Sequence, residues 1–223
     1  MARSFPPAIF ASGRNYADHA KEMYGDLPER PIIFMKNPAS VIGNGEPIII
    51  HPICEEPESQ MDFEGELAVI IGRDCRDVSE SESPDYISGY AVANDVSARW
   101  WQKHGSGGQY IRGKSFDTFC PLSDQVPADE IGDPQNLHLV TKLNGEVMQD
   151  AYTADMIFPV AVLIAELSRG MTLLAGTVIL TGTPGGVGAA RTPPRFLSDG
   201  DVVEVTIDRI GTLSNPVRRA GGA

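Results

Sequence analysis

The chain has 223 residues and a formal net charge of −12 at pH 7, from 30 acidic and 18 basic residues. This acidic balance disfavours nucleic acid and anionic membrane surfaces as partners, because both carry the same sign of charge. No apolar run is long enough to cross a membrane, and the start MARSFPPAIF lacks the pattern of a signal peptide, so we expect a soluble, cytoplasmic protein. The length and the many strand-like segments favour a single domain over residues 1–223.

The three cysteines are Cys54, Cys75 and Cys120. They are odd in number, lie far apart and show no metal-type spacing, so we interpret them as core or surface thiols in a reducing compartment.

Near the start, GRNYADHAKEM predicts a loop that enters a helix from Asp18 onward. On such a helix His19 and Glu22 lie three residues apart and can share a hydrogen bond that orients the imidazole to accept a proton from water. For an isolated pair of this kind, a plain surface contact is the simpler interpretation. Residues 31–52 then predict two short strands around an Asn-Pro turn and a Gly-Asn-Gly turn.

The segment MDFEGELAVIIG, residues 61–72, predicts a strand that carries two acids. Because side chains alternate along a strand, Glu64 and Glu66 share one face, while Phe63 and Leu67 point to the other. Two carboxylates side by side in a half-buried sheet cost several kcal/mol unless a cation neutralises them. The alternative is the solvated face of an edge strand, where Glu-x-Glu is common.

A third acid, Asp95, ends the apolar strand YAVANDV, just before the helix-like segment SARWWQK. Ligands that offer only oxygen favour Mg²⁺, Mn²⁺ or Ca²⁺ over zinc. Arg99 and Gln102 follow Asp95 on one face of that helix and could hold a substrate carboxylate or carbonyl. We expect Trp100 and Trp101 to pack against the core, with at most one of them lining a pocket.

Further along, GQYIRGKSFDTFCP places Lys114 in a loop that could aim it at an enolate or a carboxylate, although most such lysines are only solvated. Residues 137–152 predict a hairpin around Asn144-Gly145, with GEVMQD as an exposed arm. Apolar residues at helical spacing predict a helix over 157–169, with Asp155 as its cap and Pro159 in its first turn.

The chain continues with GTVIL, a buried strand, and then TGTPGGVG, a glycine-rich loop. The loop could bind an anion through its backbone N–H groups, or it could be a plain turn; it has neither the dinucleotide fingerprint nor a Walker lysine. DVVEVTIDRIGTL predicts a last strand, and we expect residues 218–223 to be frayed. Strands outnumber helices without βαβα alternation, which predicts an α+β sheet sandwich or roll.

Taken together, six motifs in order resemble the fumarylacetoacetate hydrolase family. They are GRNYADH with its His-x-x-Glu pair, DFEGELAVIIGR, AVANDVSAR, RGKSFDTFCP, DMIFPVAVLIAELSRGMTL and LTGTPGGVG. The similarity covers nearly the whole chain and places it with the short members of the family, which lack the extra N-terminal domain.

The resemblance implies an α+β fold, a mixed β-sandwich roll, and a homodimer. It implies a divalent cation, Mg²⁺ with Mn²⁺ possible, held by Glu64, Glu66 and Asp95. It also implies which residues contact the substrate or lie close to it: Arg14, Arg99, Gln102, Lys114 and Thr183. His19 and Glu22 would belong to a helical lid over residues 13–26 that is mobile when the site is empty. An extra acidic ligand of the longer members has no counterpart here, and Trp100 or Trp101 stands where many relatives have an acidic or other residue.

The same resemblance implies cleavage of a carbon–carbon bond in a 2-oxo acid such as an acylpyruvate, through an enolate that the cation and Lys114 stabilise. The alternatives are decarboxylation of oxaloacetate and keto-enol tautomerisation or isomerisation of a 2-oxo dicarboxylic acid. The presence of both His19 and Glu22 favours a bond-breaking reaction. A non-catalytic binding module and a two-metal phosphoryl-transfer enzyme fit the motifs less well.

Overall fold

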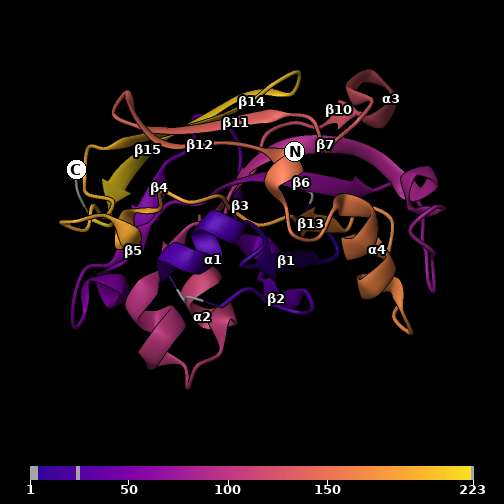
Figure 1. Ribbon diagram of the computed structural model, residues 1–223. Helices are drawn as coiled ribbons and strands as arrows, with labels where there is room; N and C mark the ends of the chain where they lie inside the picture. The colour runs from indigo at the N-terminus through magenta and orange to yellow at the C-terminus, as the bar shows by residue number, and fades with distance from the viewer. Residues whose placement is uncertain (1–4, 24–25, 222–223) are drawn as a thin grey trace.

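Two β-sheets form the frame of the computed structural model, which describes residues 5–23 and 26–221 (Figure 1). The six-stranded sheet contains, in spatial order, β10 (Val126–Pro127), β7 (Ile87–Asn94), β6 (Gly65–Ile71), β13 (Val178–Leu180), β1 (Ile9–Gly13) and β2 (Ile32–Lys36). Its strands are antiparallel except for the parallel pair β1 and β13.

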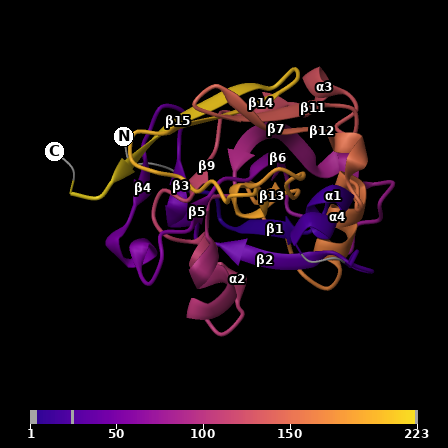
Figure 2. The same cartoon turned by 60° about the vertical axis from the view of Figure 1, so that its left-hand side comes forward.

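The five-stranded sheet contains β12 (Glu146–Tyr152), β11 (His138–Leu143), β14 (Val202–Ile207), β15 (Gly211–Arg219) and β4 (Ile48–Ile50). It lies over β6 and β7, above them in Figure 1 and again in the turned view of Figure 2. Two short pairs complete the strands: β3 (Val41–Ile42) with β9 (Cys120–Pro121), and β5 (Met61–Asp62) with β8 (Ser97–Ala98). The predicted α+β sandwich of mixed sheets is confirmed.

Short helices connect the strands. The α-helices are α1 (Ala17–Met23), α2 (Tyr110–Lys114), α3 (Ala128–Ile131) and α4 (Val160–Ser168). The 3-10 turns are η1 (Pro38–Ser40), η2 (Pro52–Glu55), η3 (Ser83–Tyr86), η5 (Thr153–Asp155) and η6 (Gly188–Ala190), and η4 (Trp101–Gly105) is a π-helix. No helix within residues 5–23 and 26–221 is long and apolar enough to cross a membrane.

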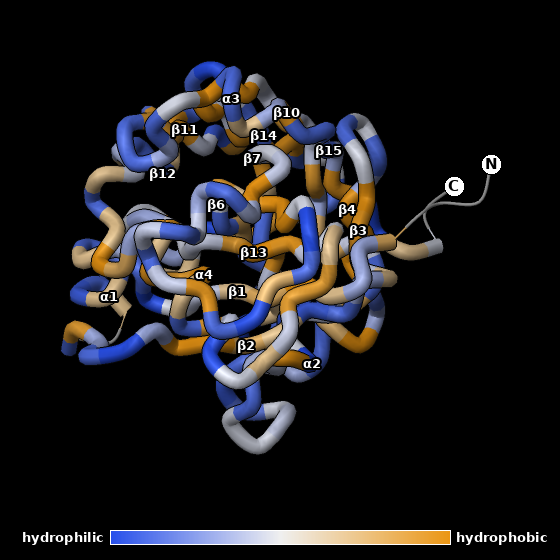
Figure 3. The backbone as a smooth tube through the Cα atoms, turned by 90° about the vertical axis from the view of Figure 1, so that its right-hand side faces the viewer, coloured by the Kyte–Doolittle hydropathy of each residue, from blue (hydrophilic) through white to orange (hydrophobic). Residues whose placement is uncertain are grey.

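The two faces of β6 pack against different groups of side chains. Phe63, Leu67 and Val69 belong to the large core cluster between the sheets. Figure 3 shows hydrophobic segments, in orange, along interior strands such as β13. The opposite face packs Ala68 against other small side chains, such as Ala91. Since both faces are covered, β6 is almost continuously apolar apart from its acids, as expected for a strand inside a protein.

The hairpin of β11 and β12 confirms the predicted turn, because Asn144 and Gly145 both have positive φ angles, 52° and 83°. The predicted arm is exposed at residues 145–147 and 150, but the prediction is wrong for the two residues between them. A β-bulge leaves Met148 without a partner, and as a result both Met148 and Gln149 are buried.

Two helix predictions need correction. Helix α4 begins at Val160 rather than at residue 157, because the N–H groups of Ile157 and Phe158 donate to the backbone and side-chain oxygens of Asn15. Asp155 accepts from the N–H of Tyr152 instead of capping α4.

In the segment predicted to be helical from residue 97, Ser97 and Ala98 form β8, which pairs with β5. The helical turn starts only at Arg99.

The predicted frayed tail, 218–223, is also wrong for residues 218–220. Strand β15 continues to Arg219, which pairs with Ile50 of β4, and Ala220 donates its N–H to the Ile50 carbonyl at 3.0 Å. Residues 222–223 lie outside the described residues.

Truncation of a core side chain on the central strand tests this packing. Leu67 is fully buried, so we expect Leu67→Ala to lower the free energy of unfolding by about 2–5 kcal/mol, through lost apolar contact and the cavity left behind. Urea unfolding followed by circular dichroism measures the loss. Ile33→Ala, on the edge strand β2 where the side chain is exposed, is the matched control and should lose far less. Equal losses would contradict the assignment of β6 to the core.

Candidate metal centre and active site

The antiparallel pairing of β6 and β7 brings the three acids together. Glu64 directly precedes β6 and Asp95 directly follows β7, and the register Gly65↔Asn94 places these two strand ends side by side. The N–H of Asp95 donates to the Glu64 carbonyl at 2.8 Å. One carboxylate oxygen each of Glu64, Glu66 and Asp95 lies within 4.8 Å of the other two, and all three residues are buried. The predicted cluster is therefore present in the structure.

Three buried cations surround two of these acids. The Lys114 ammonium lies 2.6 Å from Glu64 Oε2 and 2.6 Å from Asp95 Oδ2. Lys36 donates to the other oxygen of Asp95, and a terminal nitrogen of Arg99 lies 2.6 Å from the other oxygen of Glu64. Each carboxylate oxygen of Glu64 and Asp95 thus contacts a positive charge.

Glu66 has a different environment. Its Oε2 accepts the N–H of Gly182 at 2.7 Å. Burial, followed by the charges of Asp95 and Glu64, raises the pKa of Glu66 well above its usual range. Burial also acts to raise the pKa of Glu64, but Lys114 and Arg99 outweigh it and hold that pKa well below the usual range.

A divalent cation fits this donor set. The group offers only carboxylate oxygens, which suits Mg²⁺ or Mn²⁺. The negative charge of ionised Glu66 is unfavourable beside Asp95 and Glu64, and a cation would offset it. Glu64, Glu66 and Asp95 would hold the ion, in the arrangement that the sequence analysis expects.

Arg99 lies behind the acids. Its guanidinium spans Asp62 and Glu64, with Nε 2.9 Å from Asp62 Oδ2, and the residue is 1% exposed. It does not contribute to the lining of the cavity beside the acids. This position favours orientation of Glu64 over the direct substrate contact expected for Arg99.

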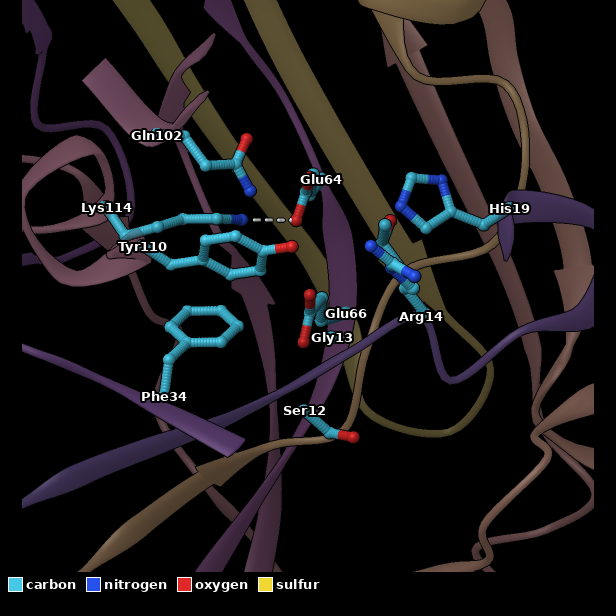
Figure 4. A pocket seen from close by; sticks show the side chains of 11 residues that line it. Ser12, Gly13, Arg14, His19, Phe34, Glu64, Glu66, Gln102, Tyr110 and Lys114 are labelled. Carbon is cyan, nitrogen blue, oxygen red and sulfur yellow. Dashed lines mark hydrogen bonds and ion pairs between the residues drawn. The ribbon is translucent and has the colours of Figure 1, made fainter. Parts of the chain in front are cut away.

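A cavity adjoins the acids and gathers most of the predicted site residues (Figure 4). Its lining consists of Ser12, Gly13, Arg14, His19, Phe34, Glu64, Glu66, Gln102, Tyr110, Lys114 and Thr183. Figure 4 shows His19 and Arg14 on one side of Glu64 and Glu66. Lys114, Tyr110 and Phe34 lie on the other side. Neither tryptophan lines the cavity; Trp101 donates its indole N–H to Ile53 and packs beside Phe116.

Phe34 and Lys36 are site residues that the sequence analysis missed. Side chains alternate along β2, so Phe34 and Lys36 both point toward the site, while Ile33 and Met35, which alternate with them, are exposed. The alternation was readable in IIFMK, but an amphipathic edge strand gives the same pattern, so it carries no specific signal.

Helix α1 covers the cavity. His19 is buried, and its Nδ1 lies 3.2 Å from Glu22 Oε1. Because a carboxylate only accepts hydrogen bonds, Nδ1 carries the hydrogen in this pair, and in the neutral tautomer that fits this bond the basic lone pair is on Nε2. Glu22 also accepts the N–H of Gly186 at 3.1 Å. Of the predicted lid, residues 24–25 lie outside the described residues, and its mobility stays a prediction.

The glycine-rich loop after β13 does bind anions through its N–H groups, and these anions are carboxylates of the same chain. Gly182 donates to Glu66, Gly186 to Glu22, and Gly188 to Asp62. Gly186 has a φ angle of 102°, and a Cβ there would lie 2.0 Å from the Met148 carbonyl, so only glycine fits.

The raised pKa of Glu66 predicts how metal affinity depends on pH. In the metal-free protein Glu66 keeps a proton at pH values where an ordinary glutamate is ionised, so the cation must displace that proton. We therefore expect Mn²⁺ affinity to fall as the pH is lowered, by up to about tenfold per pH unit below the pKa of Glu66. Calorimetric titration at mildly acidic and mildly alkaline pH measures the slope.

Glu66→Gln should weaken Mn²⁺ binding and flatten this slope. Glu80→Gln, on an exposed turn, is the control and should change neither. A slope that survives in Glu66→Gln would assign the titration to another group.

Comparison with known proteins shows similarity to one family over most of the chain. The family model described as fumarylacetoacetate (FAA) hydrolase C-terminal matches residues 8–218. The oxaloacetate tautomerase YisK of Bacillus subtilis is 46% identical over 212 residues, which are 94% of this chain and 69% of that protein. The mitochondrial oxaloacetate tautomerase FAHD2A of Homo sapiens is 42% identical over 95% of this chain and 67% of its own length.

Among solved structures, a 5-carboxymethyl-2-hydroxymuconate delta-isomerase from Mycobacterium smegmatis superposes with a TM-score of 0.84 at 42% identity, and the match covers 99% of this chain and 82% of that one. The chain spans about two thirds of the length of the curated tautomerases that it matches. The match over residues 8–218, together with these identities, shows that the chain belongs to the fumarylacetoacetate hydrolase family.

Proposed function

We propose that the protein is a divalent-metal-dependent tautomerase of oxaloacetate or a similarly small 2-oxo dicarboxylic acid. The observation that carries the proposal is the meeting of the carboxylate cluster with Arg14, His19 and Lys114 in one cavity under α1. The relatives named as oxaloacetate tautomerases support this reaction, which the sequence analysis gave as an alternative, over the carbon–carbon hydrolysis that it put first.

The charges of the site suit a dianionic substrate. Four buried acids, Asp62, Glu64, Glu66 and Asp95, face three buried bases, Lys36, Arg99 and Lys114. With all of them ionised, a divalent cation changes the sum from −1 to +1. An anionic substrate then enters a positively charged site, with Arg14 on the far side of the cluster from Lys114 as the partner for a second carboxylate.

The cavity is small in this conformation. Its free volume is about 20 Å³, which is room for about one water molecule. A four-carbon acid needs more space, so α1 or the lining side chains must move to admit it. The rings of Phe34 and Tyr110 pack edge to face, with their centroids 5.6 Å apart. They form an aromatic wall of the cavity that disfavours long substituents on the substrate.

Keto-enol conversion moves one proton from C3 and adds one to the C2 oxygen, and it consumes no water. A bound divalent cation supplies Lewis acidity at the 2-oxo group. His19, held through Nδ1 by Glu22, is placed to accept the C3 proton at Nε2. Lys114 stays protonated: burial acts to lower its pKa, but Asp95 and Glu64 outweigh burial and raise it, so its ammonium can stabilise negative charge at the C2 oxygen. The expectation that the His19–Glu22 pair implies bond cleavage was too narrow, since the same pair serves proton transfer at carbon.

Isomerisation of a larger 2-hydroxy-dienoic acid is the second candidate. The solved isomerase at 42% identity supports it, and the aromatic wall of Phe34 and Tyr110 argues against it.

The test dissolves oxaloacetate in its enol form and follows the ultraviolet absorbance of the enol, once with Mg²⁺ and once with EDTA. A coupled lactate dehydrogenase assay detects any pyruvate that forms. An EDTA-sensitive loss of enol without matching pyruvate supports the tautomerase. Pyruvate formed at the same rate as enol is lost would identify a decarboxylase. No change in either signal would contradict the proposed substrate.

His19→Asn tests the proton acceptor. We expect kcat for tautomerisation to fall by about 10²–10⁴-fold, because Asn cannot accept the C3 proton, while Mn²⁺ affinity stays close to that of the wild type. The control is His138→Asn, since His138 also pairs with a carboxylate, Asp150, at 2.6 Å, but does not line the cavity. Full activity in His19→Asn would remove this residue from the mechanism.

A further inference from the structure

The backbone between the two metal-binding glutamates loses its strand neighbour on one side. Strand β13 pairs with β6 only as far as Leu180 opposite Ala68, so at Gly65 the β13 side of β6 has no further ladder partner from that strand. An unpaired N–H or C=O group at a buried position costs about 1–3 kcal/mol, so these groups need other partners.

Gln149 and Thr183 supply them. The N–H of Gly65 donates to Gln149 Oε1 at 2.9 Å, and the Gly65 carbonyl accepts the Thr183 hydroxyl at 3.0 Å. Gln149 Nε2 donates to Thr183 Oγ1 at 2.7 Å, which closes a ring of three hydrogen bonds around Gly65. All of these side chains are buried, with Gln149 only 1% exposed.

The bulge in β12 positions the side chain of Gln149 beside Gly65. Met148 is the extra residue, so Met148 and Gln149 both turn inward where a regular strand would bury only one of them. A Cβ on Gly65 would lie 2.1 Å from Thr141 Oγ1 of β11, a strand of the five-stranded sheet. This sheet therefore packs directly against the backbone that carries Glu64 and Glu66.

Gln149 also reaches the loop that holds the lid. Its Nε2 donates to the Pro184 carbonyl at 2.9 Å, two residues before Gly186, whose N–H holds Glu22 of α1. One amide therefore connects the hairpin, the backbone between two metal ligands and the loop under α1.

We infer that Gln149 is a positioning residue, which fixes the geometry of Glu64 and Glu66 through Gly65 and that of the Glu22-binding loop through Pro184. It does not line the cavity, so it acts through these groups rather than on the substrate. The inference rests on the metal site of the proposed function.

The test compares Gln149→Met with Gln135→Met. Gln135 is the matched control, because its side chain also makes hydrogen bonds to backbone groups, those of Thr153 and Val160, at a site away from the acids. Mn²⁺ affinity is measured by electron paramagnetic resonance, and circular dichroism and thermal unfolding establish that each variant folds. We expect Gln149→Met to bind Mn²⁺ about 10–100-fold more weakly and to lower kcat more than it raises KM, and Gln135→Met to affect only stability.

Three results would overturn the inference. Wild-type Mn²⁺ affinity in a folded Gln149→Met would show that Gly65 needs no such support. Equal weakening in both glutamine variants would indicate general destabilisation. Absence of Mn²⁺ binding in the wild-type protein itself would reject the metal site, and the proposed function would fall with it.

Discussion

The burial of like charges at the meeting point of β6 and β7 is the constraint on which the rest of the structure depends. Three carboxylates within 4.8 Å of one another repel, and taking them out of water costs several kcal/mol for each ion. The chain offsets this with three buried cations on Glu64 and Asp95, but it leaves Glu66 with a raised pKa. A divalent cation would offset the charge of Glu66, so binding of the ion would also relieve the repulsion among the three carboxylates.

The scaffold converts ordinary backbone groups into supports for these charges. The loop after β13 would be a phosphate-binding loop in another setting, yet its N–H groups hold Glu66, Glu22 and Asp62. The loop therefore contacts one predicted metal ligand, Glu66, the partner of His19, which is Glu22, and the residue that binds Arg99, which is Asp62. This shared support explains how α1, of which seven residues are described, holds the imidazole of His19 at the cavity.

The sequence predicted the acid cluster because carboxylates in an apolar strand are physically unusual, and it predicted the Asn144-Gly145 turn because few residues accept two positive φ angles. It could not predict the burial of Gln149, since a bulge depends on pairing with β11 and leaves no local pattern. The start of α4 was misplaced for a similar reason: Asn15, far away in the chain, binds the N–H groups before it. Long-range hydrogen bonds of this kind override local helix signals.

The most direct test of this account is anomalous diffraction from crystals of the protein grown with Mn²⁺, recorded on both sides of the manganese absorption edge. The account predicts one strong peak within coordination distance of Glu64, Glu66 and Asp95, with Lys114 beside it. A peak at other residues, or none at these three carboxylates, would contradict the claim that the buried acids exist to hold a cation.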